Sequence, residues 1–117
     1  PFLLARMQEV HSFLASTVHV AHAHGRRGSR WADDEHAIAA MKARMPQNMR
    51  DGFAEIEHHY LAGPWVLGER FSLADIYLFV VASWLASDGV AIDEFPKVAA
   101  HARRMLARPA VQEALIL

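Results

Sequence analysis

The sequence predicts an all-α fold, a bundle of about five helices around a central apolar helix. Apolar residues recur at steps of three and four, the spacing that places them on one face of a helix. No run alternates apolar and polar residues for long enough to indicate a strand. With 117 residues and 53% hydrophobic content, the chain fits one domain, residues 1–117, that buries a sizeable core.

Two amphipathic helices are expected in the N-terminal half. The stripe of the first helix should end near His24 and comprises Met7, Val10, Leu14, Val18 and Ala21. The stripe of the second runs through Ile38, Met41, Met45, Met49, Phe53, Ile56 and Tyr60. Pro46 lies inside this second pattern and should kink the helix or divide it in two. Gly63-Pro64 should end it, with Gly63 at the C-cap.

The third predicted helix is the most apolar part of the chain. No charged side chain occurs from Ile76 to Ser87. A helix that is apolar all round is expected to be packed by others on every side. Ser87-Asp88-Gly89 should close it.

Two helices are expected in the C-terminal part. One should begin near Pro96, a residue well suited to a first turn. Its buried stripe would consist of Val98, Ala102, Met105 and Leu106. Arg108-Pro109 should break this helix, and a short last helix should cover about Ala110 to Leu115.

A polar pair stands at the start of the apolar third helix. Ser72-Leu73-Ala74-Asp75 fits a capping box, in which Ser72 is the N-cap and the Asp75 carboxylate reaches back to the Ser72 amide. Phe71 and Ile76 flank the box as a hydrophobic staple. Because a buried helix start has no water for its amides, the pair is expected to be structural.

The bulk composition excludes several classes of function. The net charge of −1 suggests neither a nucleic-acid surface nor an acidic partner. The lack of cysteine removes disulfides, thiolate catalysis and cysteine-type zinc sites, and it is compatible with the cytoplasm. No stretch approaches the length of a membrane span, and no signal peptide is evident.

The stretch GPWVLGERFSLADIYLF, residues 63–79, resembles the start of the sixth helix of glutathione S-transferases, where Gly, three residues, Ser or Thr, one residue and Ala-Asp precede an apolar run. FPKV at 95–98 and RPAVQ at 108–112 resemble the last two helices of that family, especially in bacterial beta-like members. The resemblance implies the C-terminal, all-helical domain of such an enzyme. The thioredoxin-like domain that binds glutathione and activates its thiol is absent from this chain, which begins at Pro1 without Met and looks like a piece of a longer protein.

The resemblance also implies site residues. Beta-like members carry Phe, five residues and then a His that lines the active-site cleft, and Phe13 and His19 match that element. Trp84 matches a Trp that borders the cleft, where its indole could form a wall for an aromatic electrophile. Ser12, which stands where these members usually have Asn, and Ser16 complete the candidate substrate-binding residues. No catalytic residue is expected in this chain.

Other polar residues have two interpretations each. His19, His22 and His24 invite a metal site, but no suitably spaced carboxylate accompanies them, and no metal is expected. His58, His59 and His101 are most simply surface or half-buried residues. The basic segment 25–31, GRRGSRW, is either a solvated loop or a contact for an anion or a partner.

Three functions remain open from the sequence. The first is part of a detoxifying transferase, in which this domain supplies the hydrophobic co-substrate pocket and much of a homodimer interface while glutathione is the co-substrate of the full-length enzyme. The second is a non-catalytic interaction module of the same fold, and the third is a stand-alone bundle that binds a metal or small ligand through its His-rich helix. A thioredoxin-like segment encoded just upstream of Pro1 would favour the transferase. The fragment alone is expected to be inactive.

Overall fold

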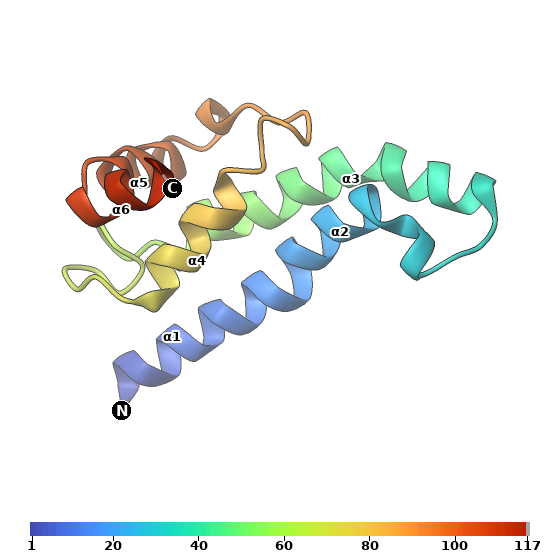
Figure 1. Ribbon diagram of the computed structural model, residues 1–117. Helices are drawn as coiled ribbons and strands as arrows, with labels where there is room; N and C mark the ends of the chain where they lie inside the picture. The colour runs from blue at the N-terminus through green and yellow to red at the C-terminus, as the bar shows by residue number, and fades with distance from the viewer. Residues whose placement is uncertain (117) are drawn as a thin grey trace.

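The computed structural model describes residues 1–116 and is built from helices joined by loops (Figure 1). Its helices form five continuous bodies in this range, which confirms the predicted all-α fold. They are α1 (Phe2–Phe13) continued by η1 (Leu14–His19) and α2 (Val20–Arg26), α3 (Glu35–Glu55) continued by η3 (Ile56–Tyr60), α4 (Leu73–Ala82), α5 (Pro96–Leu106) and α6 (Pro109–Ile116). Short 3₁₀ turns lie at η2 (Gly28–Arg30) and η4 (Ile92–Glu94). None of the helices described is both long and apolar enough to cross a membrane.

We call the continuous helix α1–η1–α2 the first body and the continuous helix α3–η3 the second body. The first body contains a π-helical segment, η1, between its two α-helical parts. Its buried residues Val10, Leu14 and Val18 are spaced by four. This spacing slightly exceeds the 3.6 residues of an α-helical turn, so the stripe would rotate away from the core over successive turns. The wider π turn offsets that drift, and all three side chains stay buried.

The two long bodies form a helical hairpin, with α2 against the first half of α3 (Figure 1). Gly25 allows their close approach, because a Cβ atom at this position would lie 2.6 Å from the Cβ of Met45. The α3 helix runs through Pro46 without a break, so of the two predicted alternatives the division is wrong and the kink stays a prediction. The packing of α3 against α2 accounts for its continuity, since tertiary contacts override local propensity.

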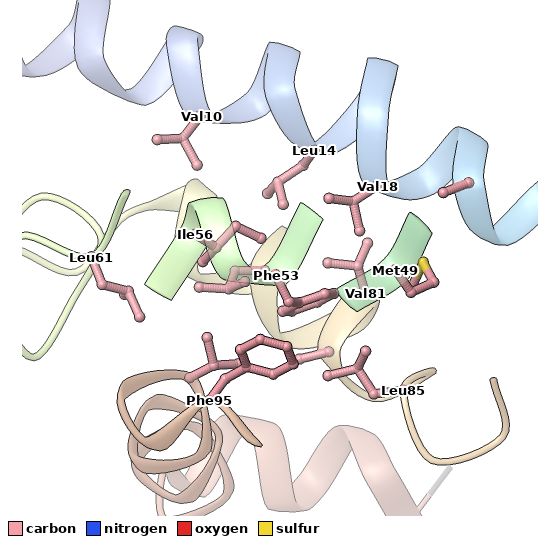
Figure 2. Packing of buried hydrophobic residues seen from close by; sticks show 14 of the residues in the cluster. Val10, Leu14, Val18, Met49, Phe53, Ile56, Leu61, Val81, Leu85 and Phe95 are labelled. Atoms are coloured by element: carbon pink, nitrogen blue, oxygen red, sulfur yellow. The ribbon is translucent and has the colours of Figure 1, made fainter. Parts of the chain in front are cut away.

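The core lies where α4 meets the hairpin. Figure 2 shows Val10, Leu14 and Val18 facing Phe53 and Met49 of α3, with Val81 beside Met49 and with Leu85 and Phe95 beyond these residues. Of the residues labelled there, all except Leu61 and Phe95 have at most 1% of their surface exposed.

The structure corrects the predicted surroundings and end of α4. Leu73, Ile76 and Val80 are 63%, 44% and 42% exposed, so this helix is covered on one side only. It ends at Ala82, five residues before Ser87. The chain then tightens into turns held by hydrogen bonds to the third residue back, such as Trp84 N–H to the Val81 carbonyl.

The second body also ends earlier than predicted. It stops at Tyr60, and its C-cap Leu61 is extended, so Gly63 is not the capping residue. Gly63 has a different steric role: a Cβ atom there would lie 3.0 Å from the Cα of Gly68. The two glycines therefore let the loop before α4 fold back on itself, with Trp65 and Gly68 exchanging backbone hydrogen bonds of 3.0 Å.

Candidate functional site

The capping box at the start of α4 is present as the sequence predicts. The Ser72 hydroxyl oxygen accepts from the Ala74 amide at 3.2 Å, and Asp75 Oδ2 accepts from the Ser72 amide at 2.9 Å. The structure therefore confirms that Ser72 and Asp75 satisfy helix donors, as a cap does.

Asp75 has two further partners that the sequence analysis missed. Its Oδ1 accepts from the Val66 amide at 2.8 Å and lies 2.8 Å from His101 Nε2. The side chains of Asp75 and His101 are both fully buried, so the expectation of a surface or half-buried His101 is wrong. Among the residues described, His101 Nδ1 has no hydrogen-bond partner. One carboxylate thus joins the loop before α4, the start of α4 and the middle of α5.

A second cluster of polar and aromatic side chains lies between the first body and α4. His19 Nδ1 lies 2.8 Å from the Tyr77 hydroxyl oxygen. Burial raises the pKa of Tyr77, which keeps the phenol protonated at neutral pH and able to donate to Nδ1. Which group donates depends on the His19 tautomer, and in the tautomer that accepts from the phenol at Nδ1, the other ring nitrogen, Nε2, is a donor.

The structure brings the two main predicted site residues together. The rings of His19 and Trp84 meet edge to face with centroids 5.0 Å apart, and His22 stacks on Trp84 at 4.2 Å. Trp84 is half-buried, so part of its indole is open to a ligand. A pocket of about 220 Å³ opens here and is lined by His19, His22, Ala23, Arg27, Arg30 and Trp84.

A buried carboxylate orients His22. Asp88 Oδ2 lies 2.6 Å from His22 Nδ1, and Asp88 Oδ1 accepts from Arg26 Nε at 3.2 Å. The Asp88 side chain is fully buried, whereas that of His22 is 19% exposed. A carboxylate beside Nδ1 fixes the ring orientation and holds the proton on that nitrogen. Sequence reasoning interpreted Asp88 only as part of a helix-ending turn.

The other two predicted substrate-binding residues lie elsewhere. The Ser16 hydroxyl donates to the Ser12 carbonyl at 2.6 Å, and both side chains are on the exposed part of the first body. Ser16 lines a separate hollow of about 430 Å³ between this body and α3. Their contact with a substrate stays a prediction. In residues 1–116, no three His, Asp or Glu side chains converge in a way that could hold a metal ion.

The chain is thus an all-helical domain with a Ser-x-Ala-Asp cap at one helix start and a pocket lined by Trp84 and two histidines. Comparison with known proteins identifies the family to which this domain belongs. The family model "Glutathione S-transferase, C-terminal domain" matches residues 36–104. The chain belongs to the glutathione S-transferase family, of which it is a C-terminal domain.

Curated relatives and solved structures agree with this assignment. The chain is 41% identical over 51 residues to glutathione S-transferase GstA of Escherichia coli O157:H7, and 42% identical over 59 residues to a 2,5-dichlorohydroquinone reductive dechlorinase of Sphingobium indicum. These matches cover 44% and 46% of this chain but 25% and 17% of the relatives.

Two solved structures match most of the chain. A glutathione transferase homologue from Sulfitobacter, with bound glutathione, matches with a TM-score of 0.96 at 45% identity. BphK, a bacterial glutathione transferase in a ternary complex, matches with a TM-score of 0.77 at 27% identity. The matches cover 98% and 93% of this chain and 55% and 51% of those chains, so the chain spans about half the length of these proteins.

Proposed function

We propose that the chain is the co-substrate-binding half of a cytoplasmic glutathione transferase that conjugates glutathione to hydrophobic electrophiles. The observation that carries this proposal is the meeting of His19 and Trp84 at one pocket in a domain of this family. A thioredoxin-like domain outside the chain would bind glutathione and activate its thiol. The chain itself, without cysteine, has no thiol nucleophile to supply.

The residues of the pocket would bind and orient the electrophile. The open part of the Trp84 indole offers a flat apolar surface on which an aromatic ring can stack. His19 Nε2–H offers a hydrogen bond to a polar substituent, and the Tyr77 hydroxyl holds the imidazole in place. Fixing the ring in this way would lower the entropic barrier to attack by a thiolate held in the other domain.

In the full-length protein, Trp84→Ala should raise KM for a neutral aromatic electrophile such as chlorodinitrobenzene about tenfold. The change removes a stacking surface worth about 1.4 kcal/mol in binding. His19→Ala should have a smaller effect in the same direction, because it removes one donor and the edge contact with Trp84. Steady-state kinetics with the electrophile varied at saturating glutathione measures both effects.

Trp31→Ala is the matched control. Trp31 is 49% exposed and packs on His24, outside the 220 Å³ pocket. Its loss should leave KM for the electrophile unchanged. Unaltered kinetics in both Trp84→Ala and His19→Ala would show that the co-substrate binds elsewhere.

We further propose that the full-length protein is a homodimer in which the hollow between the first body and α3 lies at the interface. This hollow is lined by both apolar and polar side chains, among them Phe13, Thr17, Val20 and Asp51. An arginine at the exposed Thr17 should obstruct a second copy there and shift the mass measured by sedimentation equilibrium from two chains to one. A dimer that persists in Thr17→Arg would place the interface on another face.

A further inference from the structure

We infer that the pocket beside Trp84 selects aromatic ligands that carry an anionic oxygen, either a carboxylate or a phenolate. The inference rests on the proposed function, because it assigns a substrate class to the same pocket. Two arginines that line this pocket, Arg27 and Arg30, carry the argument, together with Trp84, which lines it as well.

Positive charge in this pocket is not neutralised by the protein. Arg26 pairs with Asp88, whereas Arg27 and Arg30 form no ion pair or side-chain hydrogen bond within residues 1–116. The acidic residues that follow in the sequence, at 33–35, do not pair with them in this range either. Two guanidinium groups are therefore available to an anion, and guanidinium matches the planar geometry of a carboxylate.

The loop that bears these arginines is held in place. A Cβ atom at Gly28 would lie 3.1 Å from Ile38 Cγ2, so this glycine lets the loop pack closely on α3. The Arg30 amide donates to the Arg27 carbonyl at 3.0 Å and closes the turn between the two arginines. Because the backbone is already ordered, less entropy is lost when the side chains bind a ligand.

The remaining lining suits the aromatic part of such a ligand. Trp84, stacked on His22, gives an apolar face next to the arginines. Asp88 contacts Nδ1 of His22, which leaves Nε2 of the ring for a hydrogen bond with a ring hydroxyl. A ring stacked on Trp84 with its anionic substituent toward Arg27 and Arg30 would satisfy both halves of the pocket.

Calorimetric titration of the full-length protein with para-chlorobenzoate and its neutral counterpart para-chlorobenzamide tests the inference. The benzoate is expected to bind about tenfold more tightly, and raised salt should weaken its binding but not that of the amide. The double variant Arg27→Gln, Arg30→Gln should abolish this difference, while Arg27→Lys, Arg30→Lys, which keeps the charge but not the planar guanidinium, should retain only part of it. Arg103→Gln, an exposed arginine on α5, is the matched control and should change nothing. A parallel titration with para-nitrophenolate distinguishes a carboxylate preference from a phenolate preference. Only the anion that the pocket prefers should lose affinity in the Gln double variant.

If neither the benzoate nor the para-nitrophenolate lost affinity in the Gln double variant, the inference would be overturned. This result is separable from the proposed function, because binding is measured without glutathione. Failure to conjugate glutathione to the neutral chlorodinitrobenzene would contradict the proposed function and leave the anion preference standing.

Discussion

Replacing Asp75 by alanine is expected to lower the free energy of unfolding by about 3–5 kcal/mol, because several buried or partly buried donors lose their common acceptor at once. The substitution leaves the amides of Val66 and Ser72 and the Nε2 atom of His101 without their acceptor. The Asp75 carboxylate is fully buried, so water does not replace it readily. A loss of this size is a large part of the stability of a single domain.

Two other variants separate the cap from the wider network. Ser72→Ala removes only the hydroxyl that accepts from the Ala74 amide, and it should cost about 1 kcal/mol. Asp93→Ala removes an exposed carboxylate and should cost almost nothing. Urea denaturation of the three variants, followed by circular dichroism, measures the differences. Equal losses in Asp75→Ala and Ser72→Ala would mean that the contacts to Val66 and His101 add nothing beyond the cap.

The local part of this network could be predicted from the sequence, and the long-range part could not. Ser72 and Asp75 are three residues apart, so helix geometry alone brings them together. His101 is 26 residues from Asp75, and only the packing of α5 on α4 brings them into contact. A signal was nevertheless present, because Val98, His101 and Met105 are spaced by three and four and are all buried. The predicted stripe passed through Ala102 and Leu106 instead, and Leu106 is 45% exposed.

The candidate site shows the same division. His19 and Trp84 were predicted by resemblance to a family, and the structure brings them together at one pocket. Asp88 and His22 are 66 residues apart, so their pairing needed the packing of the first body beside α4. The sequence signal for this pairing was the spacing of the residues: Asp88 follows Trp84 by four residues, and His22 follows His19 by three. The π-helical segment before α2 could not be predicted, since no local residue preference marked it.

Glu57→Ala is expected to lower the free energy of unfolding by about 2–3 kcal/mol, because Glu57 caps a helix that has no cap of its own. The N-cap residue of α5, Phe95, has no side-chain hydrogen bond to the helix, and Pro96 has no amide hydrogen. Glu57 of η3 supplies the missing acceptors. Its Oε2 accepts from the Lys97 amide at 2.8 Å, and its Oε1 accepts from the Val98 amide at 3.0 Å.

The carboxylate of Glu57 also places a negative charge at the positive end of the α5 helix dipole. Glu57→Gln keeps one acceptor and loses this charge, so it should fall between wild type and Glu57→Ala. Glu55→Ala is the matched control. The Glu55 side chain is 57% exposed, and its ion pair with the exposed His59 is long, at 3.8 Å, so it contributes little to stability. Thermal unfolding should therefore rank the variants with Glu57→Ala lowest, Glu57→Gln next and Glu55→Ala near wild type. A Glu57→Ala variant as stable as Glu55→Ala would mean that α5 begins without help from the second helical body.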